Sequence, residues 1–316
     1  MQERYLISGG NGFLGRYLVC AAHDAGNSVF SLQRKSQPIE HAIIVAGDIT
    51  QPLDFGSNSF DVVVHSAGKA HSVPKTAEEK QAFHDINAGG TQNLLSALEE
   101  LPSLPRQFVF ISTVAVYGRE TGEAISESQP LAATEPYGKS KIEAEEMVRA
   151  WGEKNAVPVV ILRLPLVVGQ NPPGNLQSLL GALRRGRYRR IGDGSARKSM
   201  VLADDVARLV VGLRATHGTY NLSDGVHPSF AELEDAICGA WKLPAVKGVA
   251  LGKARAIASV GTGLRRVGVP FPLHTRTLEK IINPLTFDDG KARRELNWQP
   301  RAVLENIHEL TGNYAE

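Results

Sequence analysis

The chain has 316 residues, of which 42% are hydrophobic, so it is long enough to bury a substantial core and its composition excludes a disordered protein. Its formal net charge of +2 excludes the strongly basic surface that nucleic-acid binding requires. The apolar runs are too short or too interrupted to cross a bilayer, and the N-terminus lacks a signal-peptide pattern, so we expect a cytoplasmic protein.

The first half of the chain alternates short apolar runs with helical patterns. Strands are expected at 5–8, 28–32, 42–46, 61–65, 107–112 and 158–164, and helices at 13–25, 79–100 and 137–155. Near-continuous apolar strands that alternate with helices are typical of a parallel sheet with helices on both faces. The sequence therefore predicts an α/β fold with a doubly wound parallel sheet, the Rossmann fold.

The pattern changes after residue 164, where prolines and glycines cluster and the later elements become shorter. We expect residues 1–164 to form the Rossmann domain, with a return to it near 203–222. Residues 165–202 and 223–316 are expected to form a smaller, interleaved C-terminal substrate-binding domain.

The two cysteines, Cys20 and Cys238, lie far apart in the sequence, and neither belongs to a cluster of metal-ligating residues. This pattern predicts neither a disulfide framework nor a metal site. We interpret both cysteines as buried small hydrophobic residues in a reducing compartment.

A glycine-rich segment joins the first strand to the first helix. Glycines let such a turn close, and they let phosphate groups approach the backbone N–H groups at the start of the helix. This context predicts NAD(P) binding by the 1–164 domain, against the alternative of a purely structural tight turn. The expected contacts are Gly9, Gly12, Phe13, Leu14 and Gly15.

The second strand leads into Gln33-Arg34-Lys35, where NAD-binding proteins commonly carry an acid that holds the ribose 2′-hydroxyl. Two cations and no carboxylate suit a 2′-phosphate, so we expect NADP to be preferred over NAD by one or more orders of magnitude. The alternative is that Arg34 and Lys35 are solvated loop charges and that the cofactor is NAD. After the third strand, Asp48 and Ile49 are expected to border the adenine part of the site.

Tyr137 and Lys141 lie four residues apart at the start of a predicted helix, which places them on one face. A Tyr has a pKa near 10, so proton transfer near neutral pH requires positive charge nearby, which a Lys ammonium and an oxidised nicotinamide supply. Thr113 ends an apolar strand at the edge where α/β sheets bind ligands. We predict that these three residues are catalytic and that Lys141 also contacts the cofactor, although Tyr137 and Lys141 alone would also suit a surface pair.

Together these segments resemble the extended short-chain dehydrogenase/reductase superfamily, which includes nucleotide-sugar epimerases, dehydratases and ketoreductases. Further matches cover nearly the whole chain, at 64–68, 87–95, 111–118, 162–165, 192–194, 204–207 and 294–298. The resemblance implies that Ala67 and Gly68 line the cofactor. It also implies that Asn175, Arg197 and Lys198 contact the diphosphate of a nucleotide sugar, with UDP as the expected nucleotide.

The departures from the superfamily pattern reduce the number of reactions that we expect. Val114-Ala115 follows Thr113 where the 4,6-dehydratases carry Asp-Glu, so dehydration is not expected, and Leu166 replaces an Asn that is common in epimerases. Because 4-ketoreductases usually consume NADPH, the Arg34 and Lys35 cations favour reduction of a 4-keto sugar, in bacterial surface polysaccharide assembly. The alternatives are a 4-epimerase that retains NAD and, more remotely, a non-catalytic dinucleotide sensor.

The resemblance further implies a homodimer through the predicted helices at 79–100 and 137–156. Two locally basic segments remain, at 184–190 and in the acid-free run 236–278. We interpret them as solvated faces of the substrate domain, with contact to an anionic membrane as the less favoured alternative.

Overall fold

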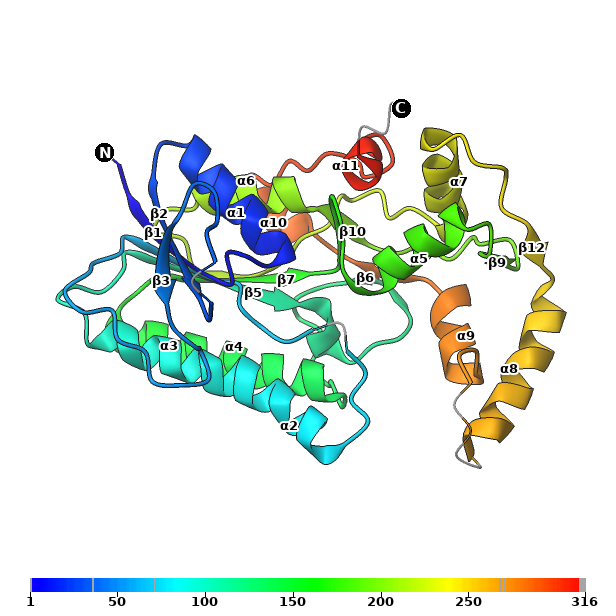
Figure 1. Cartoon of the computed structure of the whole chain (residues 1–316), viewed down its shortest axis with the longest axis horizontal. Coiled ribbons are helices and arrows are strands. Elements are labelled where there is room, and N and C mark those ends of the chain that lie inside the picture. The colour runs from blue at the N-terminus through cyan, green and yellow to red at the C-terminus, as the bar shows by residue number, and fades with distance from the viewer. Residues whose placement is uncertain (1, 36, 71, 267–268, 270, 313–316) are drawn as a thin grey trace.

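A seven-stranded parallel sheet forms the centre of the molecule (Figure 1). The computed structural model describes residues 2–35, 37–70, 72–266, 269 and 271–312. The strands run in the order β3 (Ile43–Ala46), β2 (Ser28–Gln33), β1 (Arg4–Ser8), β4 (Val62–His65), β5 (Gln107–Thr113), β7 (Val159–Leu164) and β11 (Gly218–Asn221). Every neighbouring pair is parallel. The predicted doubly wound parallel sheet is therefore confirmed.

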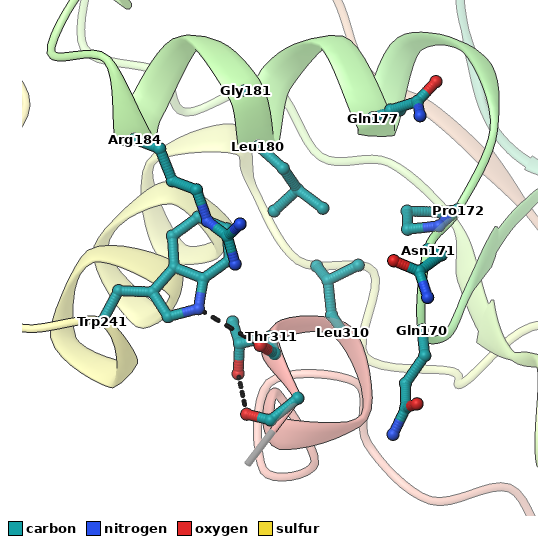
Figure 2. A pocket seen from close by; sticks show the side chains of 11 residues that line it. Gln170, Asn171, Pro172, Gln177, Leu180, Gly181, Arg184, Trp241, Leu310 and Thr311 are labelled. Carbon is teal, nitrogen blue, oxygen red and sulfur yellow. Dashed lines mark hydrogen bonds between the residues drawn. The ribbon is translucent and has the colours of Figure 1, made fainter. Parts of the chain in front are cut away.

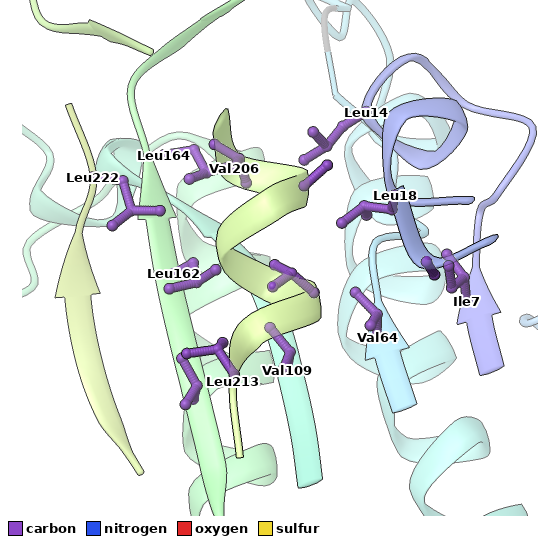
Figure 3. Packing of buried hydrophobic residues seen from close by; sticks show 14 of the residues in the cluster. Ile7, Leu14, Leu18, Val64, Val109, Leu162, Leu164, Val206, Leu213 and Leu222 are labelled. Atoms are coloured by element: carbon purple, nitrogen blue, oxygen red, sulfur yellow. The ribbon is translucent and has the colours of Figure 1, made fainter. Parts of the chain in front are cut away.

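Helices cover both faces of this sheet, as Figure 1 shows. One face carries α1 (Phe13–Asp24), α6 (Ala203–Gly212) and α10 (Gly290–Glu295), and the other carries α2 (Ala77–His84), α3 (Gly90–Glu99) and α4 (Pro136–Asn155). Alternate residues of β1 divide between the two layers because successive side chains of a strand point to opposite faces. Ile7 packs toward α1 and α6 in the cluster of Figure 3, whereas Leu6 belongs to the cluster beneath α3 and α4.

The remaining elements form small pairs outside the main sheet. The strand pairs are β6 (Gly122–Ile125) with β13 (Leu285–Phe287), β8 (Leu166–Val168) with β10 (Met200–Leu202), and β9 (Arg190–Ile191) with β12 (Gly248–Val249). The accompanying helices are α5 (Gly174–Arg184), α7 (Phe230–Ala240), α8 (Leu251–Arg266), α9 (Thr275–Ile282) and α11 (His308–Thr311). Within the described residues, no helix is both long enough and apolar enough to span a membrane.

Two expectations were wrong. The helix expected at 79–100 is divided, because α2 ends at His84 and a π-helical turn at Asp85–Gly89 precedes α3. Cys20 is exposed rather than buried, whereas Cys238 is buried as predicted. Cys20 lies out of phase with the residues of α1 that face the sheet, which include Leu14, Leu18 and Ala22.

Candidate active site

At Gly9 and Gly15, the glycine turn after β1 is packed too closely for a side chain. Gly9 has φ +72°, and a Cβ there would lie 2.8 Å from the Ala67 Cα at the end of β4. A Cβ on Gly15 would lie 2.0 Å from the Gly9 carbonyl oxygen. The first hydrogen bond of α1 runs from the Arg16 N–H to the Gly12 carbonyl (3.1 Å), so the preceding N–H groups have no partner within the helix. The turn thus provides a cradle that fits phosphate groups.

A cavity of about 580 Å³ opens at this turn and extends past the ends of β2, β3 and β4. Its lining includes most of the residues predicted to bind cofactor, namely Gly9, Gly12, Gln33, Arg34, Lys35, Asp48, Ile49, Ala67 and Gly68. Leu14 is instead buried in the core, and the Phe13 ring packs edge-on against Tyr17 at 5.9 Å. Contacts from the first turn of α1 would therefore come from its backbone.

The adenosine end of the cavity combines one acid with two cations. Asp48 accepts hydrogen bonds from the Thr50 backbone N–H (2.9 Å) and hydroxyl (2.8 Å), which hold the pKa of the Asp48 carboxyl below its usual range, and Arg34 lowers it further. Arg34 and Lys35 are both exposed. Neither forms an ion pair with another described residue, so both charges are available to a ligand.

Thr113 and Tyr137 meet where β5 ends and α4 begins. Pro136 starts α4, which suits proline because the first helical N–H has no partner. Burial raises the pKa of Tyr137, and the hydrogen bond with Thr113 counteracts this. The expected lowering by Lys141 is not seen, because the Lys141 ammonium donates to the Ile111 carbonyl at 2.7 Å instead.

Lys141 lies in an apolar environment beneath this pair. Its Nζ is 3.8 Å from the centre of the Phe110 ring. Burial lowers the pKa of Lys141 to about 7, with Glu145 acting in the opposite direction. The ammonium therefore exchanges its proton near neutral pH, which suits a group that assists a proton transfer.

A chain of hydrogen bonds fixes the residues behind the turn. Ser8 Oγ accepts from two backbone N–H groups after β4 (3.2 and 3.1 Å), so its own proton goes to His65 Nδ1 (2.7 Å). His65 Nε2 then donates to Thr91 (2.9 Å). Complete burial, assisted by Lys141, lowers the pKa of His65 to about 3, so the ring is neutral.

Asn87 connects the cavity wall to the start of α4. Its side chain accepts from the Lys69 N–H (2.7 Å) and donates to the Lys69 carbonyl (3.1 Å) and to Ser140 Oγ (2.9 Å). Ser140 in turn donates to the Tyr137 carbonyl (2.8 Å). Asn87 is part of a segment that the sequence analysis matched to the superfamily, but no role was predicted for it.

The sequence decides the family. Residues 5–222 match the NAD-dependent epimerase/dehydratase family. The chain belongs to this family. This confirms both the resemblance to the extended short-chain dehydrogenases/reductases and the prediction of an NAD(P)-dependent enzyme.

Individual members of the epimerase/dehydratase family extend the comparison. The chain is 28% identical over 249 residues to N-acetyl-alpha-D-glucosaminyl-diphospho-ditrans,octacis-undecaprenol 4-epimerase of Escherichia coli O157:H7, covering 75% of this chain and 73% of that protein. It is 30% identical over 271 residues to UDP-glucose 4-epimerase of Vibrio cholerae, covering 77% and 79%. UDP-glucuronic acid 4-epimerase of Bacillus cereus, solved with NAD, shares the fold with a TM-score of 0.73 and 19% identity, covering 98% and 97%.

A buried ion pair anchors α4, the helix that carries Tyr137 and Lys141, and the sequence analysis did not predict it. Glu145 on α4 accepts two hydrogen bonds from Arg163 on β7 (3.0 and 2.7 Å) and one from Ser112 (2.6 Å). Arg149 adds a fourth at 2.7 Å. Glu145 is fully buried, so these donors supply the compensation that its charge requires.

The three residues predicted to bind the diphosphate do not line the cofactor cavity. Lys198 Nζ donates to the carbonyls of Lys280 (2.9 Å) and Asn283 (2.8 Å) at the end of α9, and burial lowers its pKa to about 8. Arg197 donates to two carbonyls of the 226–227 turn. Asn175 is exposed near the start of α5. Their expected contact with substrate therefore stays a prediction, and Lys198 already has partners in the protein.

A separate hollow of about 420 Å³ lies among α5, the end of α7 and α11 (Figure 2). The Arg184 guanidinium lies over the Trp241 ring at 4.1 Å, and the Trp241 indole donates to the Thr311 carbonyl (3.2 Å). None of the predicted site residues lines this hollow.

The helices expected to form the dimer show no large apolar face. The large hydrophobic residues that are exposed in the described part of the chain are Ile43, Val73, Val226, Ile257, Val260 and Val269, all outside α2, α3 and α4. The homodimer stays a prediction.

Proposed function

We propose that this chain interconverts two sugars that differ in configuration at C4, acting on a diphosphate-linked sugar with retained NAD. The observation that carries the proposal is the hydrogen bond between the Tyr137 and Thr113 hydroxyls at the carboxyl end of β5, with the buried Lys141 one turn further along α4. The relatives named above support C4 as the position, because both are 4-epimerases. C4 epimerisation is therefore our first choice, in place of the reduction of a 4-keto sugar that the sequence alone favoured.

The residues present fit a dinucleotide. The turn closes tightly at Gly9 and Gly15, where a Cβ would clash with backbone, and it leaves the first N–H groups of α1 without a partner in the helix. The adjoining cavity holds both an acid and cations that pair with no described residue. When bound, the nicotinamide supplies the hydride acceptor and donor for the C4 carbon. Gly9, Gly12, Asp48, Ala67 and Gly68 would hold the cofactor.

The chain's own side chains would move the proton. The Tyr137 phenol oxygen takes a proton from the C4 hydroxyl and later returns one to the C4 oxygen. The Thr113 hydroxyl holds the same oxygen in place. Tyr137 must be a phenolate to take this proton, and burial opposes that in the cofactor-free protein. We therefore propose that the Lys141 ammonium turns from the Ile111 carbonyl toward the phenol oxygen and stabilises its negative charge when cofactor and substrate are bound.

The substrate is proposed from the chemistry that the two relatives share. One acts on a UDP-sugar and the other on a sugar joined by a diphosphate to a polyprenol. We therefore propose a sugar diphosphate as the substrate class, with UDP as the nucleotide, and we assign the sugar-binding side to residues 165–202 and 223–316. Val114 and Ala115 offer no carboxylate for an elimination, which is consistent with epimerisation rather than dehydration.

Reduction of a 4-keto sugar by NADPH remains the second candidate. It is favoured by Arg34 and Lys35, which are exposed beside Asp48 and suit a 2′-phosphate.

The test is to denature the purified protein and identify the released cofactor. The protein is then incubated with UDP-glucose and UDP-N-acetylglucosamine without added cofactor. We expect released NAD and formation of the C4 epimer, with Tyr137→Phe losing turnover while it retains NAD. A protein that is purified empty and turns over only a 4-keto sugar with external NADPH would overturn the proposal in favour of the second candidate.

A further inference from the structure

The helix α8 forms the outer edge of the molecule beside α9, away from the central sheet (Figure 1). Its inner side is tightly packed. Ala254 and Ala258 are buried in a cluster with Leu278 of α9. A Cβ on Gly261 would lie 2.2 Å from the Leu273 carbonyl oxygen, so α8 sits directly against the segment that leads into α9.

A different side of α8 exposes an apolar stripe. Ile257 is 45% exposed and Val260 is 61% exposed, and the half-buried Leu264 follows at the next helical interval. Val269, just after the helix, is 46% exposed. Three of the six exposed large hydrophobic residues of the described chain are thus concentrated at α8 and the segment after it.

The same helix carries cations that the protein itself does not neutralise. Lys253, Arg255 and Arg265 are exposed, and none of them forms an ion pair with a described residue. The chain has no Asp or Glu between 236 and 278. On α9, by contrast, Arg276 and Lys280 both pair with Glu120.

We propose that α8 docks on an anionic membrane surface. A helix that carries a short apolar stripe together with unpaired cations is suited to lie in the interface, where the stripe enters the headgroup region, Lys253 lies beside the stripe, and the long side chains of Arg255 and Arg265 add positive charge around the helix. Association with a second copy through this face would bring two acid-free basic surfaces together, which like-charge repulsion opposes. The exposed stripe distinguishes this segment from the solvated face that the sequence alone favoured.

The docking element is joined to the candidate catalytic region. Arg276 of α9 pairs with Glu135 at 3.0 Å, two residues before Tyr137. A membrane bound by α8 would therefore lie at the end of the molecule to which the start of α4 also belongs.

The experiment is sedimentation of the full-length protein with vesicles of phosphatidylcholine alone or mixed with phosphatidylglycerol, at low and high salt. We expect binding to the mixed vesicles only, weakened by salt. Replacing Lys253, Arg255 and Arg265 by Gln is expected to weaken binding about a hundredfold, at about fivefold for each charge near the surface. Val260→Ser with Ile257→Ser should weaken it severalfold.

Matched controls separate a local effect from net charge. Replacing the exposed cations Lys75, Lys80 and Arg294 by Gln removes the same charge elsewhere and should leave binding close to wild type. Ile43→Ser is the matching apolar control, since Ile43 is 59% exposed. Equal loss in both triple variants, equal binding to neutral vesicles or no binding at low salt would overturn the proposal. So would concentration-dependent dimerisation that Val260→Ser abolishes, because a second copy would then cover the stripe.

Discussion

Glu145→Gln should destabilise the protein far more than any change at the surface of the same helix. The substitution removes a fully buried negative charge whose main partner, Arg163, is also buried. An uncompensated buried cation costs about 3 to 5 kcal/mol in the free energy of unfolding. The pKa of Glu145 is lowered because the Arg163 guanidinium and the other donors outweigh the effect of burial, so the carboxyl is charged at neutral pH and this stabilisation is lost only as acid protonates it.

The assay is denaturant unfolding monitored by tryptophan fluorescence and by circular dichroism. Glu146→Gln is the control, because Glu146 is exposed and immediately adjacent. The double variant Glu145→Met with Arg163→Met removes both charges, so it should cost clearly less than the sum of the two single Met substitutions. A Glu145→Gln midpoint equal to that of Glu146→Gln would refute the reasoning, as would additive costs in the double variant.

Three further predictions concern the cofactor site. The free energy of unfolding of the cofactor-free protein should rise between about pH 7 and 10, by up to about 4 kcal/mol from Lys141 alone. The reason is that, in this range, the unfolded chain still binds the proton that the buried Lys141 amine has lost. In Lys141→Met, the free energy of unfolding should change less with pH. Gly15→Ala should abolish NAD binding and cost about 1 to 3 kcal/mol of stability, measured by calorimetry and unfolding, whereas Gly212→Ala, with open space around its Cβ position, should leave binding unchanged. Replacing Arg34 and Lys35 by Ala should weaken NADPH binding tenfold or more in a fluorescence titration while leaving NADH binding unchanged, and an unaltered ratio would identify both as solvated loop charges.

The parts of the fold that the sequence predicted are those with strong local signals. The strands β1, β2, β4, β5 and β7 of the main sheet are largely buried apolar runs, and their pattern does not depend on distant residues. The π-helical turn that divides the 79–100 helix contains Asn87, whose side chain bonds to Lys69 and Ser140, which are distant in sequence. Periodicity gives no sign of such a tertiary contact. Cys20 differs, because the helical phase of α1 already indicated an outward position.

The candidate site shows the same division. The glycine turn and the spacing of Tyr137 and Lys141 could be recognised in the sequence because each is a short local pattern. Two features could not be predicted from the sequence, namely the pairing of Glu145 with Arg163 and the hydrogen bonds of Lys198 to the end of α9. Both join residues on separate elements, so their partners follow only from the way the chain folds back on itself.

The chain of hydrogen bonds behind the cavity gives a physical reason for coupling between the glycine turn after β1 and the start of α4. Every proton in it has a determined direction, because Ser8 Oγ already accepts twice and the neutral His65 can then donate only through Nε2. The Thr91 hydroxyl donates to the Asn87 carbonyl, and the Asn87 side chain donates to Ser140 near the start of α4. A charged His65 would place a second donor against the Ser8 hydroxyl, and burial, which holds the pKa of His65 at about 3, keeps the ring in the neutral form that this arrangement requires. The residues that position Tyr137 are therefore partly those that close the turn after β1.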